Sequence, residues 1–481
     1  MENKKTIKIL GLFFLFYMIL SWVIVSGNFV DTGFTKTGFN QIGLFDLLLA
    51  PINVFNNFVV SVTKNIDGFV EKVSYGNILV AFISIGIFYG VLNKTDAYYN
   101  LVIDIKNKFS KKREVLLLSV AIIYYIISSL TGLNLLLFWF FPFICAVFNK
   151  LKFNKITIFT STIGAMLIGQ LGSLYNPTIN GVNRVLFNIP INDSIIIRSI
   201  FSFILLIVLS VFLFINDNKT NLTNEEVLLF DDKKKLKNKK DYYPIIIVTS
   251  IISIILIVCM YNWYYMFDNA KITSSYNTIM STGIKDYHFM KNILGISEAF
   301  GYWTGFSMSA LLMLSTVILS FLYRIKIDEI IDGAKRGIKD LIPTTFISLL
   351  SLSIIVISLY NSNSFIYSVI NNIFRISNHS IGLFLSGILH NFFINDYFAL
   401  LSSLSSPILT IVGIDNISLS LLITQVSHGL VSLITPFNIF LVSGLAYLNI
   451  SFTAWIKYIW KVLLIIIVLS ILILLLAALL I

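Results

Sequence analysis

The chain has 481 residues, of which 57% are hydrophobic and 12% are charged, and its mean hydropathy is +0.87. A soluble fold of this length does not need so much apolar sequence, whereas about 20 consecutive apolar residues make one membrane-spanning helix. Such runs recur from end to end, so the composition excludes a soluble protein and predicts an all-α polytopic membrane protein. The net charge of +11 does not indicate a nucleic-acid ligand, because the lysines and arginines gather in short segments between the apolar runs.

Apolar runs of spanning length occur throughout the chain. The first is longer than the apolar region of a signal peptide, about 7–15 residues, so it is expected to be retained as a span. A further run at residues 44–62 is interrupted by polar residues and is expected to lie in the interface or to enter the membrane only in part. The runs expected to cross the membrane are residues 9–26, 77–93, 156–186, 195–215, 244–260, 303–323, 341–359, 419–448 and 455–481.

Two more apolar segments are expected to enter the membrane and return. Residues 115–148 have a polar interruption and lie between two basic segments, so both of their ends face one side. Residues 381–412 form a similar unit with Asn391, Asn395 and Asp396 at the turn. Each unit is expected to be a helical hairpin, with two full spans and a re-entrant pair both left open.

Basic segments set the expected orientation. Lysines and arginines cluster in residues 94–113, 149–155 and 324–339 and near the end of residues 216–243. All of these segments fall on one side of the membrane, which the positive-inside rule identifies as the cytoplasm. We therefore expect a multi-pass protein of a bacterial plasma membrane, with its N-terminus in the cytoplasm and its C-terminus outside.

The two halves match element by element. Each has spans, then a hairpin unit, a broken helix and a closing span, and the first hairpin opens inside whereas the second opens outside. This order predicts an inverted-topology repeat with two hairpin units and two broken transmembrane helices. The expected units are residues 1–215 as the first repeat, 216–243 as a cytoplasmic linker and 244–481 as the second, inverted repeat.

Two of the expected spans, residues 156–186 and 419–448, carry a proline and several polar residues at their centres. Proline removes a backbone donor and clashes with the preceding turn, so each helix is expected to break there. In hydrocarbon, a broken helix persists only where protein packs around it or where it lines a wet cavity. Broken segments at corresponding places in two halves indicate the binding site of a transporter.

The expected binding site has two arms, one from each half. Half-helix N-termini present N–H groups to an anion, and Asn, Ser and Thr oxygens together with unwound carbonyls can hold Na⁺. A structural role is the alternative for each residue, because Asn and Ser in membrane helices often only join neighbouring helices. The expected substrate- or ion-binding residues are Thr131, Asn134, Gly172, Ser173, Asn176, Pro177, Asn391, Asn395, His428, Thr435, Pro436 and Asn438.

The sequence has no glycine-rich phosphate loop, no Cys/His metal spacing and no large hydrophilic segment that could form an ATP-binding domain. No enzymatic activity and no cofactor are therefore expected, and whether a metal is bound is left undetermined. Transport energy is expected from an ion gradient or from exchange, with the coupling ion left open between Na⁺ and H⁺.

Several segments resemble the YfcC-like C4-dicarboxylate carrier family, which is related to DcuC-type and p-aminobenzoyl-glutamate transporters. The most specific of them are GSLYNPTINGVNRVLFNIPI (residues 172–191) and HGLVSLITPFNIFLVSGLAYLNISFTAWIKYIW (residues 428–460). GVLNKTDA (residues 90–97) and DGAKRGIKDLIP (residues 332–343) are similar to further family segments. The resemblance implies a gradient-driven or exchange carrier for a small charged metabolite, such as an amino acid or a C4-dicarboxylate, and implies a homodimer.

The chain departs from that family at several polar positions. Leu135 and Leu136 replace paired glutamates, His428 replaces an aspartate, and the second hairpin lacks the family's Ser/Gly-rich tip. Two alternatives to a substrate carrier therefore stay open. One is a Na⁺/H⁺ or substrate/H⁺ antiporter, which predicts that Asp396 or His428 is buried and titrates. The other is a non-transporting protein on a degenerate scaffold, which predicts that Phe392, Tyr397 and Phe437 fill the space between the broken helices.

Overall fold

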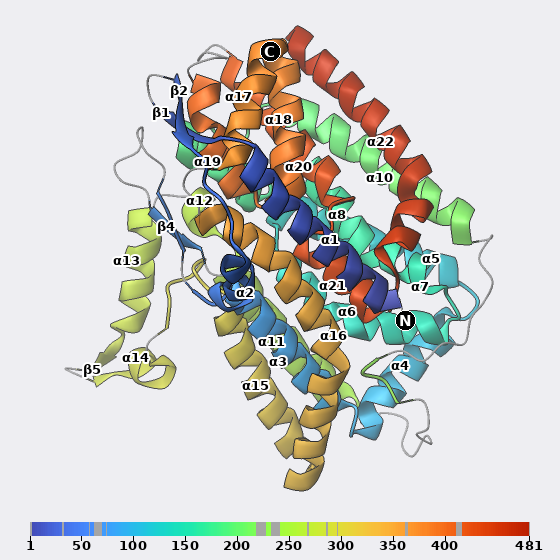
Figure 1. The fold of residues 1–481 in the computed structure, drawn as a ribbon. Helices are drawn as coiled ribbons and strands as arrows, with labels where there is room; N and C mark the ends of the chain where they lie inside the picture. Colours follow the sequence, from blue (N-terminus) through green and yellow to red (C-terminus); the bar gives the residue numbers. More distant parts are fainter. Residues whose placement is uncertain are drawn as a thin grey trace.

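The computed structural model describes residues 2–30, 33–56, 58–61, 70–73, 75–217, 228–231, 241–266, 269–284, 287–295, 297–360, 364–409 and 416–480. Within these residues, eight helical segments are long and apolar enough to cross a membrane, and a ninth is added if the bent pair α3 and α4 counts as one. The polytopic all-α membrane fold is therefore confirmed. Figure 1 shows a body of packed helices in which elements from the two ends of the chain lie side by side.

The first half runs from a long N-terminal helix to the helix that precedes the linker. The predicted spans at residues 9–26, 77–93 and 195–215 are each found as a single helix. Its elements are α1 (Glu2–Val23), β1 (Ser26–Val30), β2 (Gly33–Gly38), α2 (Leu44–Asn53), β3 (Phe58–Ser61), β4 (Val70–Val73), α3 (Gly76–Leu92), α4 (Asp96–Phe109), α5 (Arg113–Thr131), α6 (Asn134–Lys150), α7 (Lys155–Phe159), η1 (Thr160–Gly164), α8 (Ala165–Gly172), η2 (Pro177–Gly181), α9 (Val182–Phe187) and α10 (Ile195–Asp217).

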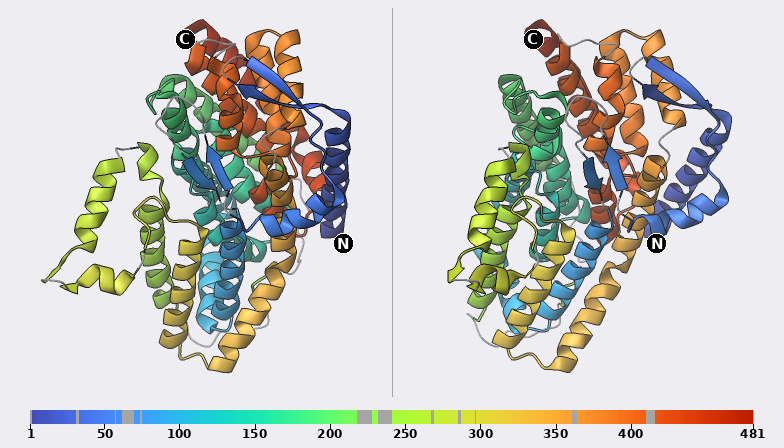
Figure 2. Two further views of the ribbon diagram at one scale, coloured as in Figure 1. Left: turned by 60° about the vertical axis from the view of Figure 1, so that its left-hand side comes forward. Right: turned by 90° about the vertical axis from the view of Figure 1, so that its left-hand side faces the viewer.

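The second half repeats the plan, with a small arm inserted after its first helix. Its elements are α11 (Tyr243–Met260), α12 (Trp263–Met266), α13 (Asn269–Met280), β5 (Gly283–Ile284), β6 (Tyr287–His288), α14 (Phe289–Leu294), α15 (Gly305–Leu322), α16 (Ile327–Tyr360), α17 (Phe365–Ile376), α18 (His379–Phe393), α19 (Tyr397–Pro407), α20 (Ile417–Ser432), α21 (Ile439–Tyr447) and α22 (Phe452–Leu480). Figure 2 shows the arm made by α13 and α14 projecting from the helical body. The strands form three separate two-stranded antiparallel pairs, β1–β2, β3–β4 and β5–β6.

Both hairpins and both broken helices are confirmed. α5 and α6 meet at a turn where Gly132 has a φ of +67°, and α18 and α19 meet at residues 394–396. The first broken helix has its gap at residues 173–176, between α8 and η2, and the second at residues 433–438, between α20 and α21. α6 and α18 are shorter, at 17 and 15 residues, than the roughly 20 residues that a full crossing takes.

Three segment boundaries differ from the sequence prediction. Residues 324–339 were expected to be a basic loop before a span at residues 341–359, but one 34-residue helix, α16, covers nearly all of both. The charged residues stay helical because straight-chain Lys, Arg and Glu are good helix formers, so the helix extends about 51 Å and beyond the apolar layer. Residues 94–113 and 360–378 likewise contain helices, α4 and α17, and α4 is bent by 92° from α3.

Residues 44–62 form neither a full span nor one element. They begin with the ten-residue helix α2, which contains Pro51, and end in the strand β3. Ten residues extend only about 15 Å as a helix, half of the hydrocarbon thickness. The sequence prediction of an incomplete span is therefore supported.

Corresponding elements of the two halves pack against each other. α3 packs along α16, α8 on α20 and α10 on α22. Glycines bring α3 and α16 together, since a Cβ at Gly86 would lie 2.6 Å from the Gly337 carbonyl oxygen and one at Gly90 would lie 2.3 Å from that of Gly333. The ascending numbers on α3 meet descending numbers on α16, so the two helices run antiparallel, as an inverted repeat requires.

The segments that the sequence assigns to the cytoplasm lie together at one end of the body. The Tyr242 hydroxyl donates a hydrogen bond of 2.5 Å to Asp104, and the Asp231 N–H donates one of 3.0 Å to the Asn93 side chain. Arg336 pairs with Asp231 at 3.4 Å. Parts of the basic segments and of the linker are therefore neighbours in space as well as in the sequence pattern.

Candidate functional site

The first break is tied to the tip of the first hairpin by Asn176. Its side-chain amide donates a hydrogen bond of 3.2 Å to the Ser128 carbonyl, near the end of α5. Its side-chain oxygen accepts from the backbone N–H and the hydroxyl of Thr178, at 2.9 and 2.7 Å, and so caps η2. Pro177 stands at the first position of η2, where its missing N–H costs nothing. One asparagine thus begins the second half-helix and holds it to the hairpin.

The chain can make this contact only because Gly132 forms the hairpin turn. A Cβ at that position would lie 2.3 Å from the Asn176 side-chain oxygen, and the φ of +67° favours glycine. Backbone and side chain of Ser129 hold the next residues of the break, since they accept hydrogen bonds from the N–H groups of Tyr175 and Leu174 at 3.1 and 3.0 Å. The tip and the break therefore form one unit.

Thr131, Asn134, Gly172 and Ser173 surround that unit. Thr131 donates to the Ile127 carbonyl at 2.5 Å within its own helix, and the Asn134 side chain accepts from the Ser128 hydroxyl at 3.0 Å. Gly172 permits close approach of Tyr125, whose hydroxyl would lie 2.5 Å from a Cβ there. Ser173 has a φ of +29°, and its buried hydroxyl has no hydrogen-bond partner among the described residues.

The second break repeats this arrangement with different residues. The Asn438 side-chain oxygen caps α21 by accepting from the Leu441 N–H at 2.9 Å, while its amide donates to Asn395 in the second hairpin at 2.7 Å. The Thr435 hydroxyl donates to the Phe392 carbonyl at 2.7 Å, and Pro436 directly follows it. An asparagine that caps the second half-helix again binds the hairpin of its own repeat.

His428 adds a further contact between the second broken helix and its hairpin. Its Nδ1 lies 2.7 Å from the Asn391 side-chain oxygen, and both residues are buried. The ring packs edge-on against Tyr397, with centroids 5.3 Å apart. The histidine therefore joins α20 to both helices of the second hairpin.

The two clusters adjoin where α8 crosses α20. Gly429 allows the approach, since a Cβ there would lie 2.5 Å from the Cα of Leu171. From α20, the Gln425 amide reaches the carbonyls of Leu171 and Gly172, each at 3.4 Å. The twelve predicted residues thus form two clusters, one per half, which Gln425 connects.

Aromatic rings fill the space beside the second break. Phe437 is fully buried and packs against Phe13, Phe392 and Phe393, with ring centroids 5.7 to 6.3 Å apart. This is the filling that the degenerate-scaffold alternative predicts at Phe392 and Phe437. At the first break, polar side chains border the corresponding space instead.

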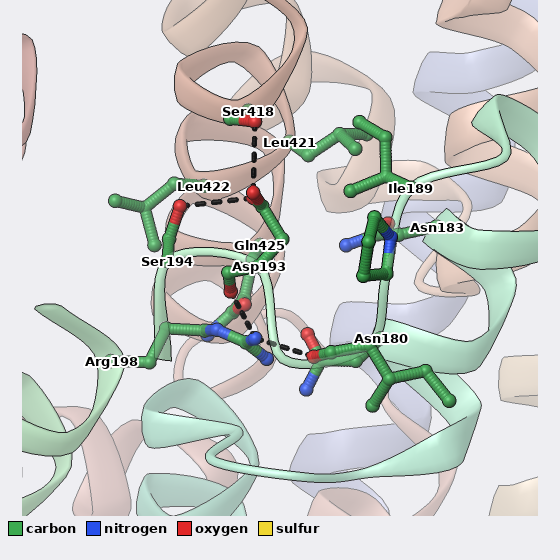
Figure 3. A pocket seen from close by; sticks show the side chains of 12 residues that line it. Asn180, Asn183, Ile189, Asp193, Ser194, Arg198, Ser418, Leu421, Leu422 and Gln425 are labelled. Atoms are coloured by element: carbon green, nitrogen blue, oxygen red, sulfur yellow. Dashed lines mark hydrogen bonds between the residues drawn. The ribbon is translucent and has the colours of Figure 1, made fainter. Parts of the chain in front are cut away.

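A pocket opens between the first broken helix and α20 (Figure 3). Its volume is about 280 Å³ with the open mouth included, but the enclosed cavity is only about 20 Å³. That cavity holds about one water molecule, so the pocket is too small for a larger ligand in this conformation. The pocket is lined by Asn180, Asn183, Ile189, Pro190, Ile191, Asp193, Ser194, Arg198, Ser418, Leu421, Leu422 and Gln425.

Arg198, one turn into α10, supplies the positive charge of this pocket. It is 3% exposed, and it is the only lysine or arginine that is buried among the described residues. Its guanidinium donates to the carbonyls of Leu174 at 3.2 Å and Ile191 at 2.6 Å, and also to the carbonyl of Asp193. Since Leu174 belongs to the first break, the arginine holds that break to the start of α10.

Besides the bonds from Gln425, two hydrogen bonds cross between the halves at this pocket. The Ser418 hydroxyl donates to the Asp193 carboxylate at 3.1 Å (Figure 3), and the Tyr397 hydroxyl donates to Asn183 at 2.9 Å. Each joins a residue of the first broken helix or the loop behind it to the second half. The pocket thus lies on a seam between the repeats.

None of the twelve predicted residues lines the pocket, so the sequence interpretation missed it. Arg198 interrupts the apolar run at residues 195–215, and an ionisable residue inside such a run is a signal of function. Asn180 and Asn183 follow Asn176 along the second half-helix and carry the same kind of signal. Together with Gln425, these three residues indicate the pocket, but each of them alone is only a weak signal.

The family model described as "DcuC: C4-dicarboxylate anaerobic carrier" matches residues 4–479 of the chain. No curated protein matches. Among solved structures, the chain is similar to the Alcanivorax borkumensis YdaH transporter, described as having an unusual topology, with 12% sequence identity and a TM-score of 0.40. That match covers 98% of this chain and 97% of the other.

Proposed function

The chain belongs to the C4-dicarboxylate anaerobic carrier family, and from this premise we propose that it carries C4-dicarboxylates across a bacterial plasma membrane. The chain is a secondary transporter of small charged metabolites. The proposal names the metabolite as a four-carbon dianion, moved either with a coupling ion or in exchange for a second anion.

The paired broken helices carry this proposal. Each break is capped by an asparagine, Asn176 or Asn438, that also binds the hairpin of its own repeat. Half-helix N-termini that follow such a break favour anionic groups, because their N–H groups and dipoles point toward it. Two breaks of the same design adjoin at the α8–α20 crossing, so a substrate bound at the first break lies next to the second.

Movement of the two repeats against each other would expose the site to either side. At this seam, the side chains of Gln425, Ser418 and Tyr397 make four hydrogen bonds between the repeats, and both bonds from Gln425 are long at 3.4 Å. Hydrogen bonds between membrane helices contribute on average about 0.6 kcal/mol each. The seam therefore opens at a cost that substrate binding can offset.

A substrate/H⁺ coupling is the second candidate, and His428 favours it. The imidazole is buried in the second cluster and bonded to Asn391, so a change in its protonation would alter a contact between α20 and the hairpin. The titratable groups near it are Tyr397 on α19, whose ring packs against the imidazole, and His390 on α18. Na⁺ remains the other candidate ion, with the Asn and Thr oxygens at the breaks as its ligands.

The expected orientation is also part of the proposal. The Asn3 N–H donates to the side chain of Asn449 at 3.4 Å, which places the N-terminus beside the start of α22. The C-terminus lies at the far end of that helix, about 43 Å away at 1.5 Å per residue for 29 residues. A membrane crossed by α22 therefore has the two termini on opposite sides, and the basic start of α1 assigns the N-terminus to the cytoplasm.

The test is uptake of labelled succinate into proteoliposomes that contain the purified full-length chain. We expect counterflow against internal unlabelled succinate, and accumulation when the correct gradient, Na⁺ or H⁺, is imposed. A Asn176→Ala/Thr435→Ala variant that stays folded is expected to lose most of this flux. Uptake no greater than in empty liposomes, from protein shown to be folded, would overturn the proposed function.

His428→Gln separates the two coupling ions. Glutamine keeps a hydrogen-bonding group near Asn391, but its amide does not take up a proton near neutral pH. With H⁺ coupling, the variant loses accumulation driven by a pH gradient and keeps exchange. Accumulation that follows a Na⁺ gradient and is unchanged in the variant assigns the coupling to Na⁺.

A further inference from the structure

The pocket at the seam has the chemistry of a carboxylate site. It gathers one guanidinium, one carboxylate (Asp193), three side-chain amides and two hydroxyls from both repeats (Figure 3). The amides belong to Asn180, Asn183 and Gln425, and the hydroxyls to Ser194 and Ser418. Apolar side chains, including Leu421 and Leu422, complete the walls. Ligand sites typically combine such walls with a few converging polar groups.

The charge of Arg198 is not matched by a direct ion pair. Of the described residues, none places a carboxylate oxygen within the 4.0 Å of a salt bridge to this guanidinium. The carboxylate of Asp193 is instead held by the hydroxyls of Ser194 and Ser418, at 3.0 and 3.1 Å. The arginine donates its hydrogen bonds to three backbone carbonyls, and carbonyls solvate a cation without neutralising it.

Burying a cation without a direct ion pair is unfavourable, so such groups in membrane proteins usually face a partner or a substrate path. The Asp193 carboxylate lines the same pocket but is held by two serines, and an anion that enters would supply the direct partner that the guanidinium lacks. Arginine suits a carboxylate better than lysine does, because its planar guanidinium binds both oxygens at once.

We propose that Arg198 binds one carboxylate of the transported anion, in the pocket that η2, α9 and α10 form with α20. This inference rests on the proposed function and assigns its substrate contact to a residue outside the two predicted clusters. Because the pocket admits about one water molecule as it stands, the substrate enters when the seam widens and the bond between Ser418 and Asp193 opens. The arginine also donates to the carbonyl of Leu174, so binding or release of the substrate by Arg198 acts directly on the first break.

The test compares Arg198→Gln and Arg198→Lys with the wild-type chain in succinate uptake. Removing one partner of a buried charge pair typically costs enough to raise the KM by about 30-fold or more, and we expect this for Arg198→Gln. Arg198→Lys keeps the charge without the fork and is expected to raise the KM by about tenfold. The matched control is Arg375→Gln on α17, where the arginine is exposed and the KM should not change.

A second measurement separates binding from a purely structural role. Succinamate, which has one carboxylate replaced by an amide, is compared with succinate as a competitor of uptake. Wild-type protein should prefer succinate, and Arg198→Gln should lose most of this preference even if its overall rate falls. A structural arginine would lower the rate and leave the preference unchanged, which would overturn the proposal.

Asp193→Asn gives a result of opposite sign and does not depend on the folding of the arginine variants. It removes the negative charge that competes with the substrate, while an amide still bonds to the hydroxyls of Ser194 and Ser418. We expect the KM for succinate to fall about threefold or more. If the wild-type protein takes up succinate but none of these pocket substitutions changes the KM, the role of Arg198 is contradicted and the proposed function stands. Absence of wild-type uptake would contradict the proposed function itself, and with it this inference.

Discussion

The two broken helices share a plan and differ in what surrounds them. At both, a capping asparagine binds the hairpin of its own repeat. The first adjoins a polar pocket with a buried arginine, whereas the second is closed by the rings of Phe13, Phe392 and Phe437. The two repeats therefore share one backbone plan. We propose a division of tasks in which the first break serves the substrate and the second is packed for stability or holds the coupling group.

The largest effect on stability is expected from Phe437→Ala, because it removes a fully buried ring from the second break. A core Phe→Ala change costs about 3–5 kcal/mol of unfolding free energy. We expect a clear fall in the thermal midpoint of the detergent-solubilised protein, while the KM for succinate in the folded fraction stays close to the wild-type value. Phe440→Ala, three residues on and only half-buried, should cost less. A large rise in KM for Phe437→Ala would show that the second break also binds substrate.

Gly132→Ala tests the junction of the first break with its hairpin. A non-glycine residue in the left-handed region costs about 1–2 kcal/mol, and its Cβ would also displace the Asn176 side chain. Succinate uptake should fall by about 30-fold or more, since cap and hairpin contact are lost together. Gly11→Ala on α1, where a Cβ meets no atom within 4 Å, should leave uptake unchanged. Normal uptake by Gly132→Ala would mean that the tip and the break move independently.

Asn176→Ser and Asn438→Ser compare the two breaks with the same change. Serine still caps a half-helix, but it is too short to reach the hairpin, so each variant loses one hydrogen bond worth about 1 kcal/mol. Similar losses of thermal stability are expected in both. The KM for succinate should rise only in Asn176→Ser, whose break adjoins the pocket. Equal KM values in the two variants would contradict the division of tasks.

The smallest effect is expected from Gln425→Leu, which removes the long hydrogen bonds between α20 and the end of α8. Such a bond between membrane helices contributes about 0.6 kcal/mol, so the KM should change by about threefold at most. Uptake kinetics measure the change in KM, and the thermal midpoint measures the change in stability. A tenfold or larger change in KM would instead identify Gln425 as a direct substrate contact.

The sequence predicts the hairpins and the breaks because their cause is local. Pro177 and Pro436 interrupt apolar runs, and asparagines stand beside them, so the breaks can be read from residue order alone. α16 could not be bounded in this way, since its charged half and its apolar half are both good helix formers and only the surrounding lipid would mark the change. The glycine pairs of α3 and α16 were also out of reach, because they matter only once the helices meet.

The pocket escaped prediction for a related reason. Its polar groups come from the first broken helix, from the loop before α10 and from α20, and none of these segments is unusual by itself. A lone arginine near the start of an apolar run is also typical of an interfacial anchor, so Arg198 carries weight only once its burial is known. The site residues named from the sequence, the homodimer and the unit boundaries stay predictions.

The most direct test of the account is to lock the seam at the pocket. Asp193→Cys and Ser418→Cys are combined in a chain whose native Cys145 and Cys259 are replaced by alanine, and succinate uptake is measured before and after oxidation. The account predicts transport in the reduced form, loss of transport when the disulfide forms, and recovery with a reductant. Full uptake by protein in which cross-linking is complete would show that the repeats do not separate at this pocket, and would contradict the central claim.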